Sequence, residues 1–328
     1  MSIPGVTTAK SGKKTKSLTN FALMVRAAAL GYRDIRAAAT EYASEYSAQS
    51  GGFAVPEDFI DTIYMRQETA LLPYCDTIPV TSNHVGVPVD GTAPWEASAI
   101  KSAWIEEGTP PDEQRPNLSL VGYRPKKMIT LVPVTEELAE DSPALNAWLP
   151  NAMGRAATWT INDAIINGLG AGRPLGILNS DALITVAKDA NQPAVTITAA
   201  NVATMMARCL DLEGARWIAN PDAIEQIVTL TGLWDSGTRT LGGLPITLTE
   251  ACQALGNKGD LILANLSGYR VANRGQALAE SSHLYFDQGM KVFRLTTRLD
   301  GSPILAAPTT PPHSIKTRSH FVTLEERA

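Results

Sequence analysis

The hydrophobic pattern of this 328-residue chain is most distinctive between Val80 and Val134. Two segments rich in β-branched residues, at 85–89 and at 118–121 continuing through 128–134, flank a polar centre broken by prolines. Their partial alternation of apolar and polar positions is typical of half-buried strands, so we predict a long β-hairpin. Its centre, residues 95–116, suits no ordinary core, because prolines interrupt a ladder and carboxylates resist burial.

The apolar side chains in the centre of this hairpin require a surface that covers them. Trp95, Trp104 and Ile105 are costly side chains to leave in water, which argues against a disordered segment. Connections of this length inside a compact domain are usually functional or disordered. Two interpretations remain: a surface hairpin folded back on its own domain, or a projecting hairpin that lies on another subunit. We favour the second.

A helical period precedes the hairpin. Apolar residues at alternating steps of four and three predict an amphipathic N-terminal helix with one stripe, formed by Phe21, Val25, Ala28, Tyr32, Ile35, Ala39, Tyr42 and Tyr46. Docking on its own domain and pairing with another chain both fit this stripe. Gly51 and Gly52 end the helix, and Pro56 begins a second one.

After the hairpin, helical and strand-like segments mix without a βαβ rhythm. A short helical turn follows Thr135, and Pro143 begins a long helix that Pro150 must kink or divide. The glycines between 168 and 176 are expected to supply the positive φ angles that end it. Shorter segments predict helices at 199–212 and 221–230 and strands at 261–264, 284–286, 292–297 and 320–324. This order predicts an α+β fold.

Composition and charge narrow the class of protein. With 44% hydrophobic and 19% charged residues, the chain is ordinary for a soluble globular protein, and no apolar run approaches the roughly 18 residues of a membrane span. Residues 1–50 carry seven basic and three acidic residues, whereas the rest carries 21 basic and 30 acidic. The basic arm fits a nucleic acid, an acidic partner or plain solvation. The acidic body argues against tight duplex binding.

Few residues point to catalysis or metal binding. Cys75, Cys209 and Cys252 are odd in number and far apart, so we expect small buried apolar residues. The four histidines lack metal-ligand spacing. The glycine-rich loop follows a helix and has no G-K-[ST], which excludes a P-loop. No nucleophile can be paired with a base, so we predict no enzyme, no catalytic residue, no cofactor and no metal site.

A series of motifs nevertheless occurs in a telling order: Gly-Gly-Phe-Ala-Val-Pro (51–56), Trp-Ile-Glu-Glu-Gly (104–108), Val-Pro-Val-Thr-Glu-Glu-Leu-Ala-Glu-Asp-Ser-Pro (132–143) and Asn-Asp-Ala-Ile-Ile-Asn-Gly-Leu-Gly-Ala-Gly-Arg-Pro (162–174). The series continues with Ala-Arg-Trp-Ile-Ala-Asn-Pro (215–221) and Phe-Arg-Leu-Thr-Thr-Arg-Leu-Asp-Gly (293–301). Each motif is weak alone, but the ordered series resembles the major capsid proteins of tailed bacteriophages (Caudoviricetes), with the Hong Kong 97 fold. The match runs from about Phe21 to Leu324.

This resemblance implies an architecture. It comprises an N-terminal arm (1–55), the start of a peripheral domain (56–82), an extended loop (83–128), the rest of the peripheral domain with its spine helix (129–194), an axial domain (195–285) and a return to the peripheral domain (286–328). In this family the extended loop lies over the neighbouring subunit.

The implied function is structural: self-assembly, through hexamers and pentamers, into an icosahedral head shell around double-stranded DNA bound without sequence specificity. The implied partners are a portal and a scaffolding protein, separate because only about fifty residues precede Gly51, with a decoration protein also possible. The expected location is the virion capsid, assembled in the host bacterial cytoplasm, with no membrane partner. The alternative with the same fold is an encapsulin shell that packages an enzyme.

We further expect the loop to clamp its neighbour without a covalent bond. Some family members join a loop lysine to a late asparagine, yet this tip reads Gly-Thr-Pro-Pro-Asp-Glu (108–113), and no asparagine follows Asn273. Instead, the tryptophans would anchor the loop and its acids would meet basic residues of the neighbour. The predicted inter-subunit contacts are Trp95, Trp104, Ile105, Glu106, Glu107, Asp112, Glu113, Arg115, Lys126 and Lys127.

Overall fold

A computed structural model describes residues 69–96, 98–108, 110, 113–115, 117–141 and 143–327. The predicted arm helix with its stripe from Phe21 to Tyr46, the helix after Pro56, and Asp112 of the loop lie outside the described residues. The described chain forms two compact units. The smaller contains 132–151 and 280–293, and the larger contains 69–131, 152–279 and 294–327.

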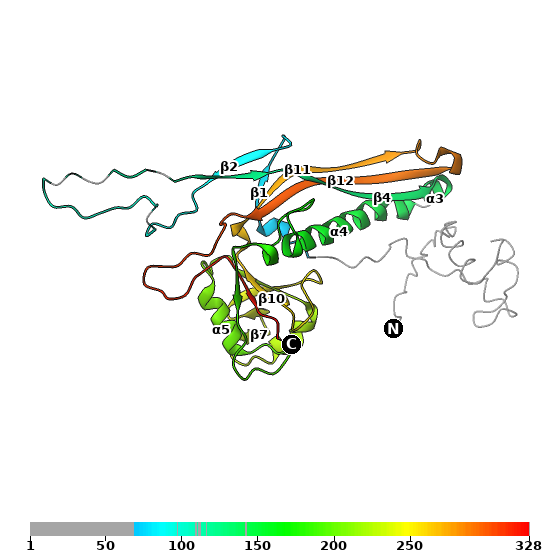
Figure 1. Cartoon of the computed structure of the whole chain (residues 1–328). Helices are drawn as coiled ribbons and strands as arrows, with labels where there is room; N and C mark the ends of the chain where they lie inside the picture. Colours follow the sequence, from blue (N-terminus) through cyan, green and yellow to red (C-terminus); the bar gives the residue numbers. More distant parts are fainter. Residues whose placement is uncertain are drawn as a thin grey trace, which may run out of the picture. The chain divides into compact units, whose positions relative to one another are not determined.

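One short strand and three long strands form a four-stranded sheet with the order β1-β11-β12-β4 (Figure 1). Its strands are β1 (Asp76–Pro79), β11 (Tyr269–Ser281), β12 (Met290–Pro303) and β4 (Lys126–Thr135). β1 pairs in parallel with β11, with Asp76 opposite Arg270, and the Arg270 Nε donates to the Asp76 carboxylate at 2.6 Å. Along β4, intermediate and exposed positions alternate strictly, so this strand keeps one face open to solvent.

Two helices follow β4, namely α3 (Glu136–Asp141) and α4 (Pro143–Asn167). Pro150 lies inside α4 and does not divide it. The glycines after α4 act in two ways. Gly170 and Gly172 have the predicted positive φ angles, 79° and 73°. Gly168 instead permits a close backbone approach, because a Cβ there would lie 2.1 Å from the carbonyl oxygen of Pro174.

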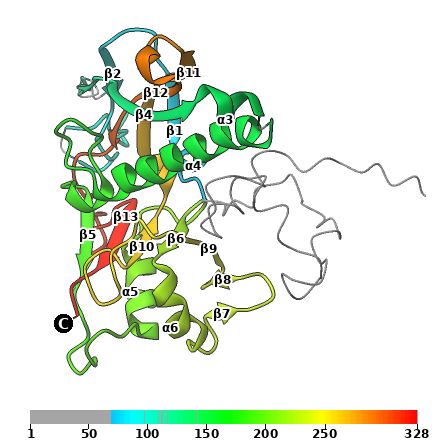
Figure 2. The ribbon, with the colours of Figure 1, turned by 90° about the vertical axis from the view of Figure 1, so that its right-hand side faces the viewer.

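The larger unit also contains a seven-stranded sheet with the order β5-β13-β10-β6-β9-β8-β7 (Figure 2). Helix α5 (Ala199–Arg208) packs against β5 and β13, and its Met205 joins Trp217 and Val322 in a fully buried core. Thr198 caps α5 in a capping box with Asn201. The strands are β5 (Leu183–Val186), β6 (Arg216–Ala219), β7 (Trp234–Asp235), β8 (Thr240–Leu241), β9 (Leu244–Leu248), β10 (Leu261–Ala264) and β13 (Phe321–Leu324).

Short helices complete the described fold: α6 (Ile224–Val228) and the 3₁₀ turns η2 (Leu72–Tyr74), η3 (Ile177–Asn179), η4 (Pro221–Ala223), η5 (Leu266–Gly268) and η6 (Phe286–Gln288). The sequence prediction for 284–286 was wrong, because Leu284 and Tyr285 form the turn before η6. The predicted helix at 199–212 ends at Arg208, and the one at 221–230 divides into η4 and α6.

The predicted axial segment, 195–285, supplies only five of the seven strands of this sheet. β5 comes from before it and β13 from after it. Residues 286–328 contribute β12 to the four-stranded sheet and β13 to the seven-stranded sheet, where Phe321–Leu324 is buried at every position and pairs with a strand on each side. The predicted domain bounds stay a prediction.

Buried charges hold the end of the described chain against this sheet. The Arg327 guanidinium pairs with the Asp260 carboxylate, and both side chains are fully buried. The Arg327 Nε donates to the carbonyl oxygen of Thr196 at 2.7 Å. Asp260 also accepts from the backbone N–H groups of Gly256 and Leu261, at 2.9 and 2.7 Å. Such additional partners are what a buried ion pair requires.

Candidate inter-subunit surface

The predicted hairpin is present, but its returning arm consists of two strands. β2 (Val85–Val89) pairs antiparallel with β3 (Ser119–Tyr123), with Val85 opposite Tyr123. β3 ends there, and β4 then begins at Lys126 in the four-stranded sheet. Pro125 lies between them and has no N–H to continue a ladder, while the Arg124 N–H donates to the Asp300 carboxylate at 2.8 Å. The single returning arm that we predicted is therefore corrected.

The distal part of the loop is open to solvent. Every residue from Lys101 to Gly108 is exposed. Trp104 is completely exposed, and Ile105 retains 45% of its accessible surface. Among the described residues, Glu106 and Glu107 form no ion pair, and Glu113 and Arg115 are likewise exposed. This segment combines large apolar side chains with carboxylates, and nothing described in its own chain covers it.

The root of the loop is instead attached to its own chain. Trp95 is 40% exposed, and its Nε1 donates to the carbonyl oxygen of Thr310 at 2.9 Å. The Lys126 Nζ donates to the carbonyl oxygens of Gly170 and Arg173, each at 2.7 Å, and lies 3.3 Å from Asp300 Oδ1. These two predicted contact residues thus have partners within the subunit. Their contact with a neighbour stays a prediction.

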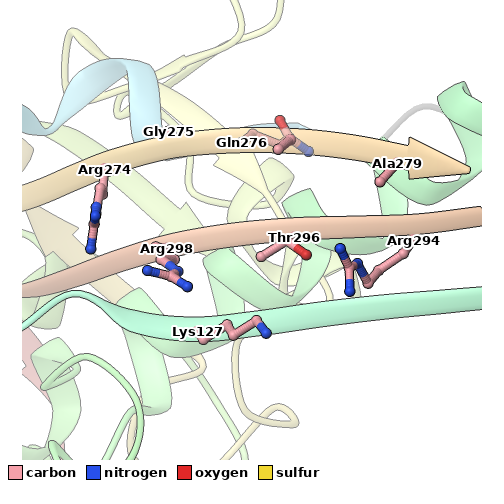
Figure 3. A pocket seen from close by; sticks show the side chains of 9 residues that line it. Lys127, Arg274, Gly275, Gln276, Ala279, Arg294, Thr296 and Arg298 are labelled. Atoms are coloured by element: carbon pink, nitrogen blue, oxygen red, sulfur yellow. The ribbon is translucent and has the colours of Figure 1, made fainter. Parts of the chain in front are cut away.

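A second feature is a hollow of about 370 Å³ on the sheet β11-β12-β4, within the larger unit (Figure 3). Its lining contains four basic side chains and no acidic one: Lys127 from β4, Arg274 from β11, and Arg294 and Arg298 from β12. Figure 3 shows these side chains distributed along the three strands. Sequence reasoning selected only Lys127. The three arginines were missed because only strand pairing brings 127, 274, 294 and 298 together.

No catalytic or metal centre is found in the part of the chain that the structure describes. No group of three or more His, Cys, Asp or Glu side chains there is placed to hold a metal ion. Burial raises the pKa of Cys75 and of Cys252 to about 12, so neither thiol ionises readily to a nucleophilic thiolate. All three cysteines are buried, as predicted. None of the described helices is long and apolar enough to span a membrane.

Comparison with known proteins bears on this arrangement. The model of the Phage capsid family matches residues 51–311. A solved structure described as the capsid of an empty GTA particle aligns with a TM-score of 0.67 and 18% identity, covering 87% of this chain and 99% of that one. A structure from Mycobacterium phage Adephagia aligns with a TM-score of 0.60 and 13% identity, covering 83% and 95%. One from Gordonia phage Cozz gives 0.55 and 13%, covering 84% and 92%.

The comparison with curated proteins finds no significant match. At these identities the structural likenesses establish the fold, and they confirm the predicted α+β capsid fold. The family match covers most of the chain and adds the function. Capsids are closed assemblies of many copies, so self-association into capsomers and a place in the virion capsid follow. The chain belongs to the phage capsid family and is a structural protein of the head shell, not an enzyme.

Proposed function

We propose that the exposed distal part of the loop clamps a neighbouring copy of the chain without a covalent bond. The observation that carries this proposal is the complete exposure of Trp104 beside Ile105, Glu106 and Glu107. Burying a tryptophan removes about 150–250 Å² from water, which corresponds to roughly 4–6 kcal/mol of gross transfer free energy at 25 cal/mol/Å². A head-shell protein offers that burial in another copy of itself.

Non-covalent attachment is supported by the composition of the loop. Residues 102–125, which include Trp104 and the tip, contain no lysine, so this segment has no amine for an isopeptide bond, and the exposed Lys101 lies before it. It offers instead an aromatic anchor and carboxylates, which bind by desolvation and by charge-assisted hydrogen bonds. Repetition by symmetry makes many such contacts cohesive, although each one is partly offset by ordering and association costs.

We also propose how the assembled shell is organised and which partners it has. Hexamers and pentamers of the chain form a shell that encloses double-stranded DNA without sequence-specific binding, with a portal and a separate scaffolding protein as partners and a decoration protein as a further candidate. Assembly takes place in the host bacterial cytoplasm. The seven-stranded sheet with α5 and α6 is the axial domain that packs around the capsomer centre. Family membership supports these points, and it favours a phage shell over an encapsulin.

Electron microscopy of the purified chain tests the proposal. We expect uniform icosahedral particles, rings or tubes, and a well-behaved monomer at high concentration would contradict it. Denaturing gels of mature particles should show only monomer, whereas a ladder of larger species would contradict the non-covalent clamp. The contents of extracted particles distinguish the two shell types, because a phage head holds DNA and an encapsulin holds a cargo protein.

A further inference from the structure

The cations of the hollow lack compensation within the described chain. Lys127, Arg294 and Arg298 form no ion pair there, and Arg274 is bonded only to the neutral Asn83 side-chain oxygen. No acidic residue lines the hollow. Like charges gathered on one surface repel one another, and this repulsion is relieved when an anionic group binds among them.

The chemistry of the hollow suits carboxylates. Three of its four cations are arginines, whose planar guanidinium groups bind a carboxylate through two parallel hydrogen bonds. A volume of about 370 Å³ is large enough to receive acidic side chains. Thr296 lies on β12 between Arg294 and Arg298 and adds a neutral hydroxyl to the lining.

An apolar strip lies on the same strand as Lys127. Alternation along β4 places Ile129 and Leu131 on the face that carries Lys127, and each retains 48% of its accessible surface. An occupant that fits both features presents carboxylates beside large apolar side chains. The described loop presents this combination at Trp104, Ile105, Glu106 and Glu107, all of which are exposed.

We propose that the hollow between β11, β12 and β4 receives Glu106 and Glu107 from the loop of a second copy of this chain. The proposal rests on the proposed clamp and deepens it by naming the receiving surface. The carboxylates enter among Arg274, Arg294 and Arg298, while Trp104 and Ile105 cover the apolar strip. Charge then fixes the register of the contact, and apolar burial supplies most of its affinity.

Charge reversal tests this pairing. Arg294→Glu with Arg298→Glu, or Glu106→Arg with Glu107→Arg, should raise the protein concentration needed for assembly about tenfold or more, since losing a desolvated charge pair costs more than one decade in affinity. Combining all four substitutions in one chain should restore assembly to within about threefold of wild type. Lys188→Glu with Lys258→Glu is the control, because both lysines are exposed, lie outside the hollow and give the same change in charge.

Circular dichroism checks that each unassembled variant is folded. If the variant with Arg294→Glu and Arg298→Glu is unfolded, Arg294→Gln with Arg298→Gln replaces it. Unchanged assembly of the hollow variants, or failure of the combined variant to recover, would overturn the pairing. If the wild type itself forms no oligomer, the proposed function fails instead, and the two failures are therefore distinguishable.

Crosslinking tests whether the contact joins two copies. A chain with Glu107→Cys and a chain with Thr296→Cys are mixed and oxidised, while the native cysteines stay inaccessible because all three are buried. Mixed dimers that neither variant forms alone are expected. Their absence overturns the proposal whether or not shells close, because the reaction needs only two associated copies.

Discussion

Trp104→Ala should abolish or strongly weaken shell assembly while leaving the free subunit as stable as before. Trp104 is completely exposed, so its removal deprives the described chain of no buried contact. Substitutions at such positions usually change the free energy of unfolding by less than about 0.5 kcal/mol. Any large effect on assembly must therefore arise in a contact with another copy.

The expected magnitude follows from the exposed area. Burial of most of the indole contributes roughly 4–6 kcal/mol of gross transfer free energy per subunit. Immobilising the side chain and ordering its surroundings offset part of that, so the expected loss is about 2–4 kcal/mol per contact. A loss of this size weakens each contact roughly 30- to 1,000-fold. Trp104→Phe keeps a large apolar ring, so its loss of contact strength should lie between those of the wild type and Trp104→Ala.

Trp95→Ala provides the contrast. Its indole N–H donates to the carbonyl oxygen of Thr310 in the same chain, so its removal also takes a hydrogen bond from the free subunit. We expect a decrease in subunit stability of about 0.5–1.5 kcal/mol from that bond alone. An unfolding measurement therefore distinguishes the two tryptophans, although both were predicted from the sequence to anchor the loop on a neighbour.

The assay combines two readouts. Chemical unfolding of unassembled subunits gives the free energy of unfolding, and sedimentation velocity at increasing concentration gives the threshold for particle formation. Trp104→Ala particles that form at the wild-type threshold would refute the reasoning. So would a Trp104→Ala subunit that unfolds as readily as Trp95→Ala, because Trp104 would then have a structural role in its own chain.

Three further predictions concern the subunit itself. Arg327→Met should cost about 3–5 kcal/mol in unfolding free energy, because Asp260 stays buried without its partner charge, and a loss below about 1 kcal/mol would contradict a buried pair. Gly154→Ala should stabilise α4 by about 0.5–1 kcal/mol. Gly176→Ala should instead impair folding, since its Cβ would lie 2.3 Å from a backbone nitrogen. Equal melting temperatures of these two variants would contradict both expectations. Burial lowers the pKa of His320 below 6.5. The contribution of the neutral imidazole to subunit stability is therefore fully present above that pH and decreases below it. Urea titrations at about pH 7.5 and 5 should show a smaller decrease in stability for His320→Gln than for the wild type.

The sequence predicted well those elements whose local pattern agrees with their final environment. Alternation in 85–89 gave β2, the buried apolar run gave β10 within its observed bounds, and Pro143 marked the start of α4. It failed where tertiary pairing determines the structure. β11 contains three Ala, one Asn, one Gly and one Glu, residue types that are depleted in strands, yet it forms a 13-residue strand because it is hydrogen-bonded to β1 and β12. Conversely, the apolar Leu284 and Tyr285 form an exposed turn and the exposed Phe286 begins η6, so none of the three lies in a strand.

The two parts of the candidate surface also differ in how far the sequence predicts them. The loop segment was identifiable because its anomaly is local: tryptophans and carboxylates lie close together where no core can accept them. The basic hollow was not identifiable, because its residues come from three strands and their common face depends on a register that no local pattern reveals. A basic residue on an isolated strand is indistinguishable from an ordinary solvated side chain.

Attachment of the loop root changes how the exposed segment can work. Trp95 is bonded to Thr310, and Lys126 to Gly170, Arg173 and Asp300, so both ends of the loop are held by its own subunit. Restricting the ends reduces the conformational freedom that the intervening segment must lose on binding, which lowers the cost of association. Affinity can then come from a small anchor such as Trp104 with its two neighbouring carboxylates. Loosening the root by Lys126→Ala should therefore weaken assembly even with Trp104, Glu106 and Glu107 intact, and sedimentation thresholds equal to wild type would show that the root contributes nothing.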